Sequence, residues 1–384
     1  MLDRSSGLQQ GGHGDSAILS LPAIIVRTDA SPTLSVAGLP VLDRLLVACH
    51  RAGFSPLRVL SRLPLPDLPR TKAWSIPFTV VSELSPTISG KLLFLTDTWL
   101  VQTTDLQHLL GADGRLASDK SGKAPIGLIS AQDLDDPEAA LARLPCVASA
   151  GVLAPVRNEK EAEIATRQLW NSITSSTDGF IDRWFNRPIG RLLLSKRLIL
   201  TPISPNQISV ASILVGLAGA WLLAKGTWAS GGLGALLFQA SAVIDCVDGD
   251  VARIVFKESA IGKWLDIIGD QIVHGAIFVG IALGLSRTGD PSLALTLGAA
   301  SVAGGLISFL VVLRALKSPE LKADGRFQRF LDGATSRDFS VLVLLLAIAG
   351  RLDWFLWMAA VGSNCFWIAC LALQFRARGG GRLA

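Results

Sequence analysis

Two pairs of aspartates lie in the segment 245–270, which reads DCVDGDVARIVFKESAIGKWLDIIGD. Asp245 and Asp248 are three residues apart, and Asp266 and Asp270 are four apart, so each pair shares one face if the segment is helical. Four converging carboxylates repel one another unless cations lie between them. Because no Cys/His set accompanies them, such oxygen ligands suit Mg²⁺ or Mn²⁺ rather than zinc. The spacing therefore predicts a divalent metal site.

The residues between the two pairs predict a phosphate ester as the partner of that metal. Mg²⁺ held by a few carboxylates usually completes its shell with substrate phosphates. Arg253 lies eight residues after Asp245 and could bind phosphate through two parallel hydrogen bonds. Gly249 and Gly262 leave room for a ligand or a second helix to approach. Each pair also adjoins a long apolar run, and ionisable groups at membrane depth favour a functional interpretation.

The elements that must position these groups are membrane-spanning helices. The chain has 384 residues, of which 50% are hydrophobic and 17% charged, which excludes a disordered, collagen-like or small disulfide-rich protein. Long uncharged runs occupy the last 180 residues or so. One of them, Phe339–Gly350, is short for a span, so five spans remain an alternative to six. The six predicted spans are Ile208–Ala224, Trp228–Ile244, Gln271–Ser286, Ser292–Leu313, Phe339–Gly350 and Trp354–Phe375.

Basic residues predict the orientation of the spans. They concentrate in alternate loops and in the C-terminal tail, so the positive-inside bias places both termini and the two aspartate pairs on the cytoplasmic side of the inner membrane. The five cysteines show no paired spacing, which favours a reducing compartment for the soluble half. The net charge is +5, and basic residues lie near apolar segments. This pattern fits binding to anionic lipid better than binding to nucleic acid.

Four regions are expected along the chain: a loose tail (1–17), an α/β domain with a mostly parallel sheet (18–175), an amphipathic juxtamembrane helix (176–207) and an all-α membrane domain (208–384). The juxtamembrane helix mixes Trp184 and Phe185 with arginines, so its aromatic residues are predicted at the headgroups and its cations toward lipid phosphate. The α/β domain is predicted from strands alternating with helices. Its predicted strands are Ala23–Val26, Leu57–Leu60, Lys91–Leu95 and Gly151–Val156, and the helical stretches are Val41–Ala52 and Glu159–Ser172.

The aspartate segment resembles a known family. Its pattern D-x2-D-G-x2-A-R-x8-G-x3-D-x3-D is that of the CDP-alcohol phosphotransferases, and the resemblance extends over 178–375 with a Pro205-Asn206 start to the first span. The resemblance implies transfer from a CDP-alcohol to an acceptor hydroxyl with release of CMP, in phospholipid or inositol phosphodiester synthesis. It also implies a homodimer in the lipid bilayer. The fixed positions are Asp245, Asp248, Gly249, Ala252, Arg253, Gly262, Asp266 and Asp270.

The same resemblance assigns roles to these residues. It implies two metal ions, Mg²⁺ or Mn²⁺, on the aspartates, with Asp270 sharing in ligation or acting as the base on the acceptor hydroxyl. Arg314 and Arg337, at the cytoplasmic ends of two spans, are candidates for binding an acceptor phosphate. Cys246 is interpreted as a packed residue, and His274 as a core residue or a proton relay from Asp270. The residues implied to bind CDP are Asn206, Gly249, Ala252, Arg253 and Gly262.

The N-terminal half resembles, more weakly, a sugar-nucleotidyltransferase domain of the kind found fused to such phosphotransferases. The similarity rests on Ala37–Leu60 and Lys91–Val101, and it places Asp97 at the metal position. Active members carry a Gly-rich basic loop that holds a triphosphate through backbone amides. The corresponding stretch, Val26–Pro40, has one glycine and one arginine, so the domain is predicted to be degenerate.

Two further interpretations remain open on the residues alone. A bifunctional enzyme would use an active N-terminal cytidylyltransferase to make its own CDP-alcohol. A cation transporter would use the four carboxylates as an ion site, although such sites usually lie at the bilayer midplane between repeats. No repeat is apparent here, and the acids cluster toward one membrane face.

Overall fold

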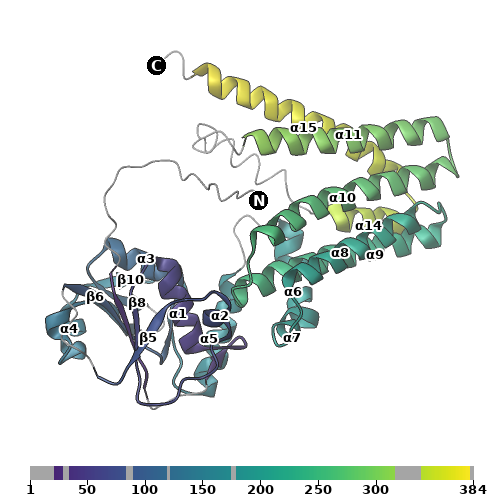
Figure 1. The fold of residues 1–384 in the computed structure, drawn as a ribbon. Helices are drawn as coiled ribbons and strands as arrows, with labels where there is room; N and C mark the ends of the chain where they lie inside the picture. Colours follow the sequence, from purple (N-terminus) through teal and green to yellow (C-terminus); the bar gives the residue numbers. More distant parts are fainter. Residues whose placement is uncertain are drawn as a thin grey trace, which may run out of the picture. The chain divides into compact units, whose positions relative to one another are not determined.

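The computed structural model describes residues 21–28, 34–83, 90–118, 122–173, 179–315 and 339–380 (Figure 1). The chain divides into two compact units, Met1–Thr166 and Arg167–Ala384, which are described separately. Helix α5 (Glu159–Ser172) runs across the boundary between them. The predicted tail at 1–17 lies outside the described residues.

The first unit is built on a mixed sheet, seven-stranded in the described residues, with the order β10-β8-β9-β6-β1-β4-β5. The central strands β6, β1, β4 and β5 are parallel, and β9 runs antiparallel to β6 and β8. The α/β prediction is therefore confirmed. The strands are β1 (Ala23–Val26), β4 (Leu57–Leu60), β5 (Phe78–Val81), β6 (Lys91–Thr96), β8 (Arg115–Ser118), β9 (Gly122–Ser130) and β10 (Cys146–Ala148).

Short helices and two small two-stranded antiparallel sheets complete this unit. Apolar side chains of β1 and β6, among them Ile24, Ile25 and Leu93, are fully buried, as are Leu45 and Leu46 of α1. The strands predicted at 23–26 and 57–60 match β1 and β4, whereas only Ala154–Pro155 of the predicted strand 151–156 is extended. The remaining elements are α1 (Val41–Ala52), α2 (Pro69–Ala73), α3 (Thr103–Gly111), α4 (Pro137–Arg143), β2 (Ser35–Val36), β3 (Leu39–Pro40), β7 (Trp99–Leu100) and β11 (Ala154–Pro155).

The second unit is all-helical. Within the described residues, five helices are long and apolar enough to cross a membrane, and a sixth apolar helix, α14, is shorter. Five spans are the alternative to the six predicted ones, and Arg337 lies outside the described residues. The helices are α8 (Pro205–Leu223), α9 (Trp228–Ile254), α10 (Ala260–Ser286), α11 (Pro291–Ala315), α14 (Phe339–Ile348) and α15 (Leu352–Gly380).

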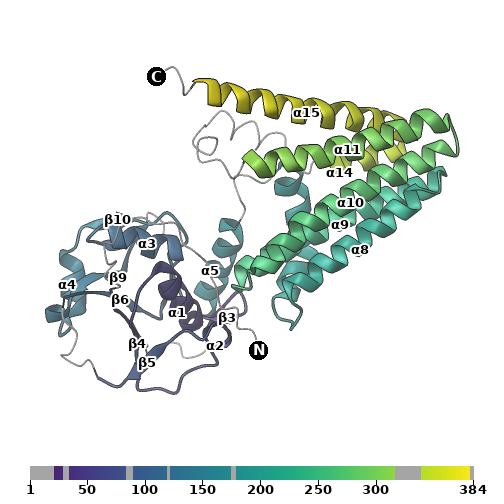
Figure 2. The ribbon, with the colours of Figure 1, turned by 45° about the horizontal axis from the view of Figure 1, so that its top comes forward.

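Helix α8 packs against both α9 and α10 (Figure 2). Glycines allow their backbones to approach closely. A Cβ atom on Gly219 of α8 would lie 2.7 Å from the carbonyl oxygen of Gly234 on α9, and one on Gly280 of α10 would clash with the carbonyl of Ala220. Ser204 begins α8 with a capping box that includes Gln207, which satisfies backbone groups at the helix start. The three helices thus form a tightly packed support.

The juxtamembrane segment is one helical stretch made of a π-helical turn (Asp182–Asn186), α6 (Arg187–Gly190), a second π-helical turn (Arg191–Ser195) and α7 (Lys196–Leu198). Its apolar residues point outward: Trp184 is 69% exposed and Leu192 73%. Its buried face is polar, with Asn186 completely buried. The predicted amphipathic helix therefore exists, but its inner face is the polar one.

Candidate active site

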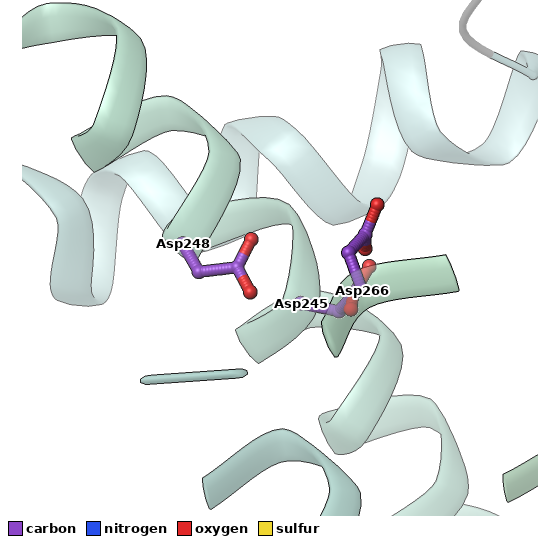
Figure 3. A group of neighbouring side chains, drawn as sticks. All are labelled: Asp245, Asp248 and Asp266. Carbon is purple, nitrogen blue, oxygen red and sulfur yellow. The ribbon is translucent and has the colours of Figure 1, made fainter. Parts of the chain in front are cut away.

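Three carboxylates converge between α9 and α10. One oxygen each from Asp245, Asp248 and Asp266 lies within 4.8 Å of the other two (Figure 3). Figure 3 shows Asp245 and Asp248 on one helix and Asp266 on its neighbour. Asp248 is buried, and the other two are partly buried. Among the described residues, this is the one group of three or more acidic, His or Cys side chains with such spacing. Carboxylates held this close fit a divalent cation, which would relieve their repulsion.

Helices α9 and α10 extend beyond the apolar runs from which the spans were predicted, and the aspartates lie in these extensions. Helix α9 continues beyond Ile244 to Ile254, and α10 begins at Ala260, before the predicted span starts at Gln271. Ser259 caps α10, since its hydroxyl accepts a hydrogen bond of 2.9 Å from the Gly262 amide. The acids therefore lie on regular helices, where the three- and four-residue spacing does place each pair on one face.

Asp270 lies next to this group and not within it. It lines a small cavity of about 20 Å³ together with Asp245, Asp266 and His274. Such a volume is about that needed for one water molecule. His274 also packs against aromatic rings, with its ring centroid 4.7 Å from that of Phe339. The position of Asp270 is compatible with a role as base, and both its predicted roles remain predictions.

A larger cavity of about 550 Å³ adjoins the carboxylates. Asp248 and Asp266 line it, and so do all five residues predicted to bind CDP. Its volume is within the range of small-molecule sites. Lys257 and Lys263, which are not positions of the motif, also line the cavity. The five predicted residues gathered there are Asn206, Gly249, Ala252, Arg253 and Gly262.

Two glycines that line this cavity leave space for neighbouring side-chain atoms. A Cβ atom on Gly262 would lie 2.8 Å from Oδ1 of Asn206, so glycine lets the start of α8 approach α10. A Cβ atom on Gly249 would lie 3.1 Å from Nη2 of Arg253. The hydroxyl of Ser209 on α8 forms a hydrogen bond with the carboxylate of Asp248. This contact orients a carboxylate of the cluster, and the motif did not predict it.

Several other predicted residues have different surroundings. Arg314 is exposed near the end of α11 and lines neither of these cavities, and Arg337 lies outside the described residues. Cys246 is buried, with Sγ 3.6 Å from Oδ1 of Asp182, in agreement with its prediction as a packed residue. Two arginines of the juxtamembrane helix, Arg187 and Arg191, bind the buried carboxylate of Asp250. The prediction that the cations of this helix face lipid phosphate is wrong for these two, because Asp250 gives them a partner inside the protein.

Asp97 of the N-terminal unit is buried directly after the end of β6. The side chain is 5% exposed, and its Oδ1 accepts hydrogen bonds of 3.0 Å from both the amide and the hydroxyl of Thr28. Nε of Arg27 lies 4.0 Å from Oδ2. Burial raises the pKa of Asp97, and the hydrogen bonds from Thr28 and the charge of Arg27 oppose this rise. These contacts tie the end of β6 to the residues that follow β1.

Comparison with known proteins agrees with this geometry. Residues 202–365 match the family model described as CDP-alcohol phosphatidyltransferase. The C-terminal half of the chain therefore contains a CDP-alcohol phosphatidyltransferase domain, as the aspartate motif indicated.

More particular similarity is to proteins called bifunctional IPC transferase and DIPP synthase. That of Archaeoglobus fulgidus is 29% identical over 229 residues, covering 57% of this chain and 43% of the relative. An archaetidylinositol phosphate synthase of Methanothermobacter thermautotrophicus is 35% identical over 100 residues, covering 26% of this chain and 49% of the relative. The chain thus spans less than half the length of these curated relatives.

Among solved structures, the phosphatidylinositol phosphate synthase of Mycobacterium tuberculosis in complex with manganese and citrate is similar. It is 21% identical, and the match covers 49% of this chain and 87% of that chain with a TM-score of 0.35. The same synthase with CDP-DAG bound is 22% identical and also has a TM-score of 0.35, covering 49% of this chain and 92% of that chain.

Proposed function

We propose that this protein transfers a phosphoalcohol group from a CDP-alcohol to an acceptor hydroxyl and releases CMP. One observation carries the proposal: three converging carboxylates border a cavity of about 550 Å³ that gathers all five residues expected to bind CDP. The bond that forms joins the acceptor oxygen to the β-phosphorus, and the bond that breaks joins that phosphorus to the oxygen of CMP. Positioning and electrostatics carry most of such a transfer.

Asp245, Asp248 and Asp266 are proposed to hold a divalent ion, Mg²⁺ or Mn²⁺, with a second ion shared by Asp270. When bound, these ions supply positive charge that neutralises the diphosphate and stabilises the leaving CMP. Arg253 binds a phosphate oxygen from the cavity side. Asp270, which lines the adjoining small cavity, accepts the proton of the acceptor hydroxyl.

The printed names of the relatives favour an inositol-type alcohol, as IPC transferase, DIPP synthase or archaetidylinositol phosphate synthase. The donor is then CDP-inositol or CDP-diacylglycerol. The N-terminal unit is proposed to be a scaffold, because Thr28 engages one oxygen of Asp97 and the stretch Val26–Pro40 lacks a Gly-rich basic loop. The transporter alternative is less well supported, since the acids lie toward one end of α9 and of α10.

The direct test measures CMP release by the purified full-length protein with Mg²⁺. CDP-inositol and CDP-diacylglycerol are offered separately, each with inositol 1-phosphate. We expect release with one donor, loss of release in EDTA, and recovery when Mg²⁺ or Mn²⁺ is restored. Asp353→Asn is the matched control, because this carboxylate forms an exposed pair with Arg351. A protein that releases no CMP from either donor, or releases it equally in EDTA, would contradict the proposal.

The location of the soluble unit has its own test. We propose a protein of the inner membrane, functioning as a homodimer, with both termini in the cytoplasm. Cys146 of the N-terminal unit is exposed. A membrane-impermeant maleimide added to intact spheroplasts should leave Cys146 unlabelled and should label it after lysis. Labelling before lysis would reverse the orientation.

A further inference from the structure

Asp250 follows the motif glycine and is not one of the fixed motif positions. Its side chain is 1% exposed, although it lies on α9 next to Gly249, which lines the cavity of about 550 Å³ proposed to bind the CDP-alcohol donor, here called the donor cavity. Three guanidinium groups surround it. Nε of Arg191 lies 2.7 Å from Oδ2, Nη1 of Arg187 contacts Oδ1, and Nη2 of Arg253 lies 3.4 Å from Oδ1. A buried charge is tolerated when it is paired in this way.

The contact with Arg253 is the longest of the three. Arg253 lines the donor cavity and keeps 38% of its side chain exposed, whereas Arg187 and Arg191 are 9% and 15% exposed. The carboxylate of Asp250 already pairs with the guanidinium groups of Arg187 and Arg191, so it attracts the more distant guanidinium of Arg253 more weakly. Arg253 is therefore oriented by Asp250 and still available to a phosphate. Gly249 supports the same orientation, because its missing Cβ leaves space for the guanidinium.

The two closer arginines come from the juxtamembrane helix, which is fastened to α9 along its polar face. Nε2 of Gln239 donates a 2.6 Å hydrogen bond to Oδ1 of Asn186. A Cβ atom on Gly190 would lie 2.9 Å from the side chain of Val247, so the helix and α9 touch closely. The docking of this helix thus determines how much of the charge of Asp250 remains to act on Arg253.

We propose that Asp250 is a positioning residue that orients Arg253 toward the diphosphate of the donor, and that Arg187 and Arg191 keep its hold on Arg253 weak. This inference rests on the proposed function of the cavity. It predicts that Asp250 affects donor binding more than turnover, and that its effect passes through Arg253.

The test compares Asp250→Asn, Arg253→Gln and the double variant, with Asp353→Asn as the matched control. We expect Asp250→Asn to raise the KM for the CDP-alcohol roughly tenfold, the size expected from one charge-assisted hydrogen bond, with kcat nearly unchanged. Added to Arg253→Gln, it should raise KM no further. Independent KM increases that multiply in the double variant, or an unchanged KM in Asp250→Asn, would overturn the inference.

A binding measurement separates this inference from the function itself. Calorimetric titration of CDP should show the same weakening in Asp250→Asn and Arg253→Gln, while titration of cytidine should show none. If Asp250→Asn does not fold, Asp250→Asn with Arg187→Met removes the buried charge together with a partner and is measured instead. If the unmodified protein releases no CMP from either donor while CDP binding follows the expected pattern, the proposed function fails and the role of Asp250 in binding the diphosphate stands. No weakening of CDP binding would exclude that role.

Discussion

The two units of this protein place aspartates very differently. Asp97 in the N-terminal unit accepts two hydrogen bonds from Thr28 and is almost completely buried. Asp245, Asp248 and Asp266 in the C-terminal unit instead face one another beside a cavity. Thr28 holds one oxygen of Asp97 through both of these hydrogen bonds, whereas carboxylates that face one another repel unless a cation lies between them. The contrast shows that the partners of an aspartate, more than its place in a motif, indicate its function.

The glycines of the two units differ in the same way. In the N-terminal unit, Ala37 (φ 46°) and Gly38 (φ 77°) form the tight turn between β2 and β3. That glycine serves a hairpin in the stretch where an active nucleotidyltransferase has a phosphate-binding loop. In the C-terminal unit, Gly249 and Gly262 lie at the cavity and leave space for Arg253 and Asn206. Glycines of the second kind leave space at the cavity that is proposed to bind the CDP-alcohol.

The largest expected effect is on the carboxylate cluster. Asp266→Asn removes one of three facing carboxylates, and we expect CMP release to fall at least about 10²-fold, as when a group that stabilises transition-state charge is lost. The measurement is kcat for CMP release at saturating Mg²⁺, with Asp353→Asn measured in parallel. Activity within a few-fold of the unmodified protein would show that the cluster is no more functional than Asp97.

A smaller effect is expected at the cavity wall. Gly262→Ala would place a methyl group 2.8 Å from Oδ1 of Asn206, so Asn206 must move. We expect KM for the CDP-alcohol to rise about tenfold while kcat changes little, the pattern of lost uniform binding. Gly275→Ala on the same helix is the control, because a Cβ there meets nothing within 4 Å. Equal KM values in the two variants would break the contrast between the glycines.

The smallest effect is expected at Asp97. Asp97→Asn should leave the rate of CMP release within about twofold of that of the unmodified protein. The reason is that a buried side chain of the N-terminal unit takes no part in the chemistry of the C-terminal unit. Asparagine can still accept the hydrogen bonds of Thr28 through Oδ1. A large loss of CMP release, or CDP-inositol made from CTP and inositol 1-phosphate by the unmodified protein alone, would make this unit a second active centre.

The raised pKa of Asp97 gives the stability of the unmodified protein a pH dependence that the Asp97→Asn variant lacks. A carboxyl with a higher pKa in the folded state binds its proton more tightly there, so stability falls as pH rises from about 4, the ordinary value for aspartate, through the folded value. Asp97→Asn lacks this loss. Its unfolding temperature in the full chain, followed by calorimetry, should therefore gain on the unmodified protein between pH 4 and pH 7. A difference that does not change with pH would contradict this account.

The site residues could be predicted from the sequence because their relation is local. Spacings of three and four residues fix the faces of α9 and α10 whatever the rest of the chain does. The pairing of Asp250 with Arg187 and Arg191 joins residues about 60 positions apart and depends on how the juxtamembrane helix packs, which no local pattern records. The resemblance to a family supplied Asn206, which its own surroundings in the sequence do not single out.

The fold could be predicted in outline for similar reasons. Buried central strands such as β1 and β6 contain continuous apolar runs, whereas most side chains of β5, β8 and β10 are at least partly exposed, so the pattern missed these three strands. The ends of the spans were misplaced because hydropathy stops at the first aspartates, while the helical hydrogen bonds of α9 continue to Ile254. Helix α14, with ten described residues, has the composition of a span without its length.

The unequal burial of the long helices affects how each helix responds to the thickness of the bilayer. Half of the most apolar window of α9 is buried within the unit, against 17% for α11 and α15. Helices that are exposed to lipid along most of their length respond first to a change in the hydrocarbon thickness of the bilayer, and they do so by tilting. In a thinner or thicker membrane, α11 and α15 would take up the mismatch, and α9 would carry its aspartates unchanged.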